Sequence, residues 1–147
     1  MRTLATFRVV PPPGRRADRV TTVLGLEPTA VHEEGDPVGR RSAQTFETAM
    51  WLLENAADVQ DDVELGASLT VLLDRLEPVA SRLWELHAEG HCIDWVCYVV
   101  SCATEHAVEL GRSLLVRLTA LPGDLFLDVY PEDEDGGGPP GVDGPIG

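Results

Sequence analysis

The sequence contains no lysine, few cysteines and no long apolar run. A helix that crosses a bilayer needs roughly 18 mostly apolar residues, so we expect no membrane helix and no membrane partner. The short apolar run at the N-terminus stops at Pro11 and is not followed by a small-residue cleavage site, as a secretory signal would be. We therefore expect a cytoplasmic protein.

Basic residues are scarce after the first part of the chain. Residues 1–41 contain seven Arg and five acidic residues, a net charge of +2, whereas the remainder contains four Arg and twenty acidic residues, a net charge of −16, which together give −14. Such a chain repels the phosphates of DNA and RNA, which argues against a nucleic-acid partner. An acidic surface is attracted to basic ones, so the charge favours a basic protein as partner.

The densest group of metal-ligating residue types comprises His87, His91, Cys92, Cys97, Cys102 and His106. Three cysteines around one strand are not a disulfide framework and indicate free thiols. A zinc site would need these side chains to converge. Cys97 and Cys102 are an odd number of residues apart and would face opposite sides of a strand, and Gly90 separates the first two histidines. We therefore expect neither a metal nor a cofactor.

Catalytic signatures are also missing. The motifs G-x-S-x-G, G-x-x-x-x-G-K-[ST] and G-x-G-x-x-G, typical of serine hydrolases, nucleotide sites and dinucleotide sites, do not occur. A cysteine nucleophile needs a base held close to it, and the neighbours His91 and Cys92 would point to opposite faces of a strand. No catalytic residue is predicted.

The strongest periodicity lies between residues 61 and 89. Apolar residues recur there at alternating steps of four and three, which is typical of one helical stripe: Leu65, Leu69, Leu72, Leu76, Val79, Leu83 and Leu86. Pro78 interrupts the stripe, and a proline inside a helix costs roughly 3 kcal/mol because it removes a hydrogen bond and clashes with the preceding turn. The pattern predicts a long central helix that is kinked near Pro78.

The remaining periodicities predict strands at 4–10, 29–33, 48–53, 92–102, 107–110 and 124–130, and helices at 15–24 and 111–121. With the central helix, the order is β-α-β-β-α-β-β-α-β. This order is typical of an α+β domain, here residues 1–130, with a mostly antiparallel sheet and helices packed on one face. Residues 131–147 combine acidic residues with Gly and Pro, which predicts a disordered tail.

The segment after the second strand is the most function-like part of the sequence. It combines acidic residues, a Gly-Asp-Pro turn and two arginines in a connection, and connections often contain binding residues. Tryptophans nearby in the fold could line a pocket, although we expect Trp84 to belong to the core. The candidate binding residues are His32, Asp36, Arg40, Arg41 and Trp51. The alternative is a hydrophilic hairpin loop with no ligand.

Several short motifs follow one another in a fixed order along residues 4–130. They are LGLEPT at 24–29, GD at 35–36, Trp51, the Leu-rich helix with Pro78, residues 118–121 and DVY at 128–130. In this order they resemble the bacterial family catalogued as domain of unknown function 4279. The resemblance implies an α+β domain with no established activity, and it assigns no catalytic residue.

Three hypotheses about function follow. The first is a non-enzymatic protein-interaction or inhibitor-like module, of the immunity type, that covers a basic surface of its partner. The second is a small-molecule or metal-dependent enzyme that uses the His/Cys cluster in residues 87–106. The third is a homodimer that pairs through an exposed Leu/Trp face.

Overall fold

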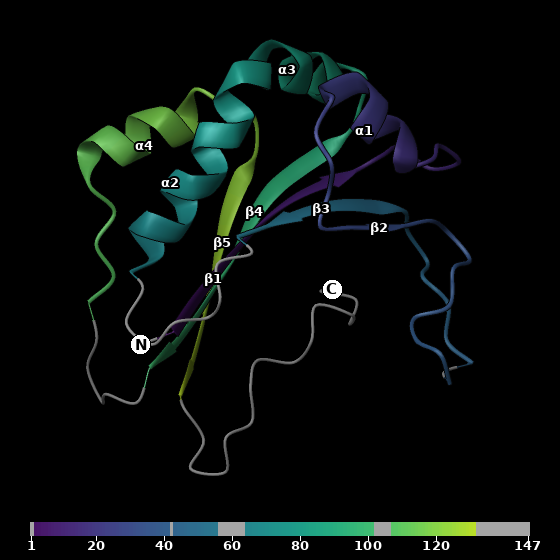
Figure 1. Cartoon of the computed structure of the whole chain (residues 1–147), viewed down its shortest axis with the longest axis horizontal. Helices are drawn as coiled ribbons and strands as arrows, with labels where there is room; N and C mark the ends of the chain where they lie inside the picture. Colours follow the sequence, from purple (N-terminus) through teal and green to yellow (C-terminus); the bar gives the residue numbers. More distant parts are fainter. Residues whose placement is uncertain (1, 42, 56–63, 102–106, 132–147) are drawn as a thin grey trace.

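A five-stranded sheet organises the computed structural model, which describes residues 2–41, 43–55, 64–101 and 107–131 (Figure 1). The strand order across the sheet is β2-β3-β1-β4-β5. The elements in chain order are β1 (Arg2–Val10), α1 (Asp18–Leu24), β2 (Ala30–His32), β3 (Met50–Glu54), α2 (Leu65–Leu76), the 3-10 turn η1 (Glu77–Val79), α3 (Ala80–Ala88), β4 (Cys92–Ser101), α4 (Arg112–Thr119) and β5 (Asp124–Pro131).

The sheet is mostly antiparallel, as predicted. β1 lies at its centre and is antiparallel to both β3 and β4, and β2 is antiparallel to β3. Only β4 and β5 are parallel, because α4 connects them as a crossover helix. The α+β class and the helices on one face are therefore confirmed (Figure 1).

One predicted strand is wrong. Residues 107–110 have no regular secondary structure, and the chain passes directly from there to α4. Val108 and Leu110 both pack against the core. The alternation of apolar residues that predicted a strand is therefore explained by these core contacts and not by pairing with another strand. A strand also needs a partner that supplies hydrogen bonds, and no described strand lies beside this segment. A single strand, β4, lies between α3 and α4, not the two strands that the sequence predicted.

The central helix bends where the sequence predicts. α2 ends at Leu76, Pro78 lies in the first turn of η1, and α3 continues from Ala80. Pro78 has no N–H and fits the first positions of a helical turn, where that donor would be unpaired in any case. Gly90 follows α3 with φ of 99°, a left-handed conformation that glycine adopts without strain. The bend lets both halves of the helix follow the sheet.

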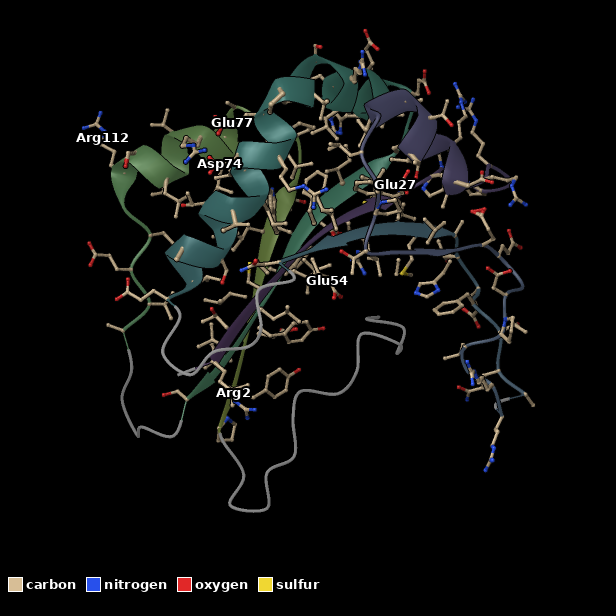
Figure 2. All side chains as sticks on the ribbon, in the orientation of Figure 1. Arg2, Glu27, Glu54, Asp74, Glu77 and Arg112 are labelled. Carbon is tan, nitrogen blue, oxygen red and sulfur yellow. The ribbon has the colours of Figure 1, made fainter. Side chains whose placement is uncertain are left out.

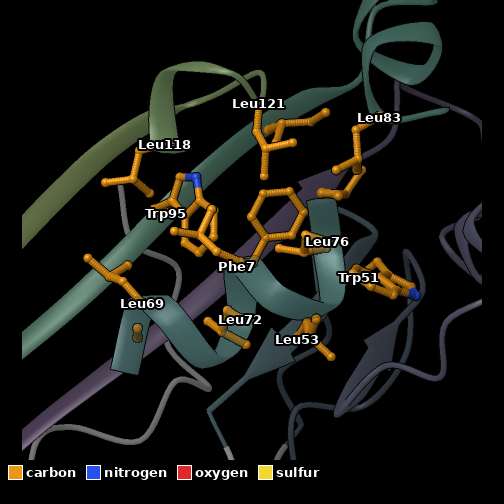
Figure 3. Close-up of a cluster of buried hydrophobic side chains, with 14 of the residues drawn as sticks. Phe7, Trp51, Leu53, Leu69, Leu72, Leu76, Leu83, Trp95, Leu118 and Leu121 are labelled. Carbon is orange, nitrogen blue, oxygen red and sulfur yellow. The ribbon is translucent and has the colours of Figure 1, made fainter. Parts of the chain in front are cut away.

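The core lies between the sheet and the helices, and Figure 3 shows its centre. Phe7 and Trp95 meet edge to face there, with ring centroids 4.8 Å apart. The Leu stripe of α2 and α3 is buried against these rings. Trp84 is different, because it is 45% exposed and its Nε1 donates a hydrogen bond to the Ala120 carbonyl at 2.9 Å. The expectation that Trp84 belongs to the core is wrong, since it lies beside the stripe.

The described part of the chain contains no helix long and apolar enough to cross a membrane. The predicted tail, residues 131–147, lies outside the described residues except for Pro131, which ends β5.

Candidate functional site

The predicted binding segment is a folded excursion between β2 and β3. Its backbone closes on itself through the N–H of Phe46, which donates to the Asp36 carbonyl at 2.8 Å, and through a bridge between Pro37 and Thr45. The His32 ring stacks on Phe46, with centroids 4.0 Å apart and planes 17° apart. These contacts make the segment a hairpin-like loop of defined shape.

Acidic side chains attach this loop to α1. Asp36 Oδ2 accepts the N–H of Glu33 at 2.9 Å, which closes the turn. The Glu33 carboxylate in turn accepts the N–H of Ala17, the residue before α1. A carboxylate at this position is favoured by the positive end of the helix dipole. Glu33 and Asp36 therefore support the fold, whatever else the loop does.

The five predicted binding residues do not form one cluster. Arg40 and Arg41 are exposed in the loop. Trp51 is fully buried on the helix-covered side of the sheet, where its Nε1 donates to Thr21 Oγ1 at 3.0 Å. His32 lies on the opposite side of the sheet from Trp51. Its register partner is Met50, and Met50 and Trp51 are neighbours on β3, so they face opposite sides. The structure brings His32 and Asp36 into one loop and places Trp51 elsewhere, and a binding role for any of the five stays a prediction.

The His/Cys cluster does not converge among the residues that the structure describes, where no group of three His, Cys, Asp or Glu side chains could hold a metal ion. His91 is buried, with Nδ1 2.9 Å from the Leu86 carbonyl, and burial lowers its pKa. Burial raises the pKa of the Cys97 thiol to about 12, so this thiol stays protonated and is a poor nucleophile. Cys92 is exposed. Cys102 and His106 lie outside the described residues.

An ion pair on the helix-free face of the sheet was not predicted. Arg8 Nε and Nη2 each donate to one carboxylate oxygen of Asp94 at 2.8 Å, and the two side chains are 16% and 7% exposed. The hydrogen bonds to Asp94 raise the pKa of Arg8. The two residues are register partners on β1 and β4. In the sequence, each of these charged residues stands out because it lies in the middle of an otherwise apolar strand. That the two pair with each other follows only from the register between β1 and β4.

The same face continues toward β5 through two tyrosines. The rings of Tyr98 and Tyr130 stack with centroids 6.2 Å apart. Burial raises the pKa of Tyr98, and the nearby Asp128 carboxylate raises it further. Tyr98 is therefore neutral at physiological pH. Its stacking joins the edge strand to the centre of this face.

A second unpredicted ion pair lies between α4 and α2. Arg117 donates to the Glu77 carboxylate and to Asp74 Oδ1, the latter at 2.6 Å, and Figure 2 labels both acidic side chains beside α4. These hydrogen bonds raise the pKa of Arg117. All three side chains are partly exposed, and exposed ion pairs contribute little to stability. Asp74 and Glu77 neutralise the positive charge of Arg117, the arginine of α4 that lies next to α2.

Among the residues that the structure describes, the last two elements carry most of the large apolar side chains that are exposed. β5 is the final strand of the sheet, and nearly all of its residues are exposed. Phe126 is 52% exposed and Val129 is 60% exposed. Asp124 and Asp128 lie on the same strand, and neither forms an ion pair with another described residue. This apolar strand with two unpaired carboxylates is the candidate site that sequence periodicity did not identify.

Comparison with known proteins assigns the family and no activity. A family model described as "Domain of unknown function (DUF4279)" matches residues 2–132, so the chain belongs to this family. No curated protein matches the chain. No solved structure matches it either.

Proposed function

We propose that this member of a family without an assigned activity is a non-enzymatic protein-binding module. One observation carries the proposal. Among the described residues, nine large apolar side chains are exposed, and seven of them lie on α4 and β5. The seven are Leu115, Val116, Leu125, Phe126, Leu127, Val129 and Tyr130, and we call them the α4–β5 patch.

Such a concentration is unusual for a surface with no partner. Scattered single apolar side chains are normal on protein surfaces, whereas several on one strand mark a candidate interaction site. Five of the seven lie on β5, divided between its two faces. Two of the seven are aromatic, and aromatic side chains are enriched in the centres of interfaces. The described remainder of the chain adds only Val71 and Trp84 to the exposed set. The asymmetry supports a binding role for the α4–β5 patch.

The charge suggests what the partner is. The chain has a net charge of −14, which accelerates association with basic proteins and slows association with acidic ones. An inhibitor-like role of the immunity type, in which the module covers a basic surface, fits this charge. The proposal includes the cytoplasmic location expected from the sequence, where the free thiols of Cys92 and Cys97 would remain reduced.

The test begins with capture of the partner. The immobilised protein is incubated with a lysate of the source organism at low salt, the retained proteins are identified, and the main one is purified. We expect a basic protein whose Kd rises between 50 mM and 500 mM NaCl, since salt screens charge attraction. A variant with Phe126→Ser should lose most of the affinity, whereas Val71→Thr, an exposed apolar residue outside the patch, should keep it.

Two results would contradict the proposal. One is a purified partner that binds wild type and the Phe126→Ser variant equally at every salt concentration. The other is a lysate from which the wild-type protein retains nothing above an unrelated acidic control protein of similar size.

A further inference from the structure

The two edges of the sheet offer different templates for another strand. An edge strand presents one row of unpaired backbone N–H and C=O groups, which can pair with an added chain. At one edge β2 has only three residues. At the other edge β5 has eight residues, and no described strand lies on its outer side. Among the described strands, β5 is therefore the longer of the two edges (Figure 1).

The two faces of β5 differ in chemistry. Its register with β4 places Leu125, Leu127 and Val129 on the same side as the core residues of β4. These three side chains are 36%, 42% and 60% exposed, so the helices do not cover them. This face of β5 is apolar along its whole length.

The other face alternates acidic and aromatic residues, in the order Asp124, Phe126, Asp128 and Tyr130. Carboxylates four residues apart on a strand are separated by about 13 Å. No described cation pairs with either one. Arg8, an arginine on the same face of the sheet, is already bound to Asp94. Two cations on an added strand, also four residues apart, would match these carboxylates.

We propose that β5 binds an extended, basic segment of the partner protein by strand addition, so that the segment becomes the sixth strand of the sheet. The proposal rests on the proposed function and adds its geometry. The segment carries Arg or Lys four residues apart, opposite Asp124 and Asp128, and apolar side chains on the other face. Backbone hydrogen bonds supply affinity, and the alternating side chains supply specificity.

A second copy of the chain is a poorer occupant than a basic strand. Two β5 strands related by a two-fold axis would be antiparallel, with the helices of both copies on one face. A two-fold centred on Phe126 places Asp124 opposite the partner's Asp128, and one centred on Asp128 places two Asp128 carboxylates opposite each other. Like charges directly opposite one another are destabilising. Centring on Leu127 keeps the carboxylates diagonal, yet still joins two chains of net charge −14.

The test uses a capped eight-residue peptide with Arg at positions 1 and 5, Thr at positions 3 and 7, and Val at the four even positions. A control peptide has Glu in place of both Arg residues. Amide hydrogen exchange of the full-length protein is measured by NMR with and without peptide. We expect the Arg peptide to protect every second amide of β5, because alternate N–H groups of a strand point to opposite sides and the others already face β4. The Glu peptide should protect none.

Matched variants separate the contributions of charge and apolar contact. Replacing both carboxylates (Asp124→Asn with Asp128→Asn) should weaken binding of the Arg peptide by about five- to tenfold at low salt, the range expected for two exposed ion pairs. Removing two negative charges elsewhere (Glu27→Gln with Glu47→Gln), both at exposed positions, should weaken it by less than about twofold. Val129→Thr should weaken binding more than Val71→Thr.

The outcomes distinguish this inference from the proposed function. If the captured partner binds but leaves β5 amides unprotected, strand addition is wrong and the binding module stands. If no partner is captured while the Arg peptide protects β5, the proposed function fails and the strand-addition site remains. A concentration-dependent dimer of the free protein that Phe126→Ser abolishes in sedimentation would identify a second copy as the occupant and overturn the basic strand.

Discussion

β4 and β5 lie side by side in the sheet and differ strongly in burial. They pair in parallel over eight residues, from Asp94 opposite Asp124 to Ser101 opposite Pro131. Both are rich in apolar residues, yet β4 is buried at every position after Cys92, whereas β5 is exposed at every position except Asp128, which is partly buried. β4 has a strand on each side and helices over one face, whereas among the described residues β5 has a strand on one side only.

The difference shows that apolar composition does not decide burial within a sheet. The apolar residues of β4 contribute to stability because folding removes them from water, at roughly 25 cal/mol per Å². Those of β5 keep much of their surface in water and contribute less. Residues that the fold does not bury, arranged along an open edge, support the proposal that a partner buries them.

The largest expected effect compares the register partners Trp95 and Leu125. Trp95 is 1% exposed and packs against Phe7, so Trp95→Ala should lower the free energy of unfolding by about 3–5 kcal/mol. Leu125 is 36% exposed, and Leu125→Ala should lower it by about 1 kcal/mol or less. Urea denaturation followed by circular dichroism measures both. Similar losses for the two variants would mean that β5 is as well supported as β4.

The next comparison uses the register partners Asp94 and Asp124. Asp94→Ala leaves the largely buried Arg8 guanidinium without its partner and should lower the free energy of unfolding by about 3 kcal/mol. Asp124→Ala removes an exposed carboxylate and should change it by about 0.5 kcal/mol or less. The same denaturation experiment applies, at pH 7. A loss at Asp124 as large as that at Asp94 would show that its carboxylate has a structural role.

A third prediction concerns the turn that brings β5 against β4. Gly123 has φ of 123°, and a Cβ there would lie 2.9 Å from the Ile93 carbonyl oxygen. Gly123→Ala should lower the free energy of unfolding by about 1–3 kcal/mol, because the backbone is strained for any residue with a side chain and the contact is with backbone that cannot turn away. Gly39→Ala, where a Cβ meets nothing within 4 Å, is the control. Equal stability of the two variants would contradict this reading of the turn.

The smallest effect is a pH dependence at the entrance to β4. Burial lowers the pKa of His91 from its ordinary value of 6.5, so the unfolded chain binds more protons than the folded one once pH falls through 6.5, and the folded state loses stability as pH falls. His91→Gln can still donate toward the Leu86 carbonyl but cannot titrate. The difference in unfolding free energy between wild type and variant should therefore shift against wild type from pH 8 to pH 5.5. A difference that is constant across this range would show that His91 does not contribute.

Local signals explain what could be predicted. Two features depend on the conformational limits of single residues and could therefore be predicted from residue identity alone. They are the kink at Pro78 and the end of α1 at Gly25, which has φ of 67°. The predicted strand at 107–110 failed because Val108 and Leu110 alternate like strand residues while packing against the core from an irregular segment. The candidate loop does lie in a connection, between β2 and β3. Its binding role stays a prediction.

The sequence by itself determined the class of the fold and the positions of nearly all its elements, because periodicity, proline and glycine act within a few residues. Only the tertiary structure decided which strand became an edge and which charges met. Arg8 and Asp94 are 86 residues apart in sequence, and the exposure of β5 depends on what lies beside it in space. Contacts between distant residues set both, and no local pattern within β5 distinguishes it from a buried strand.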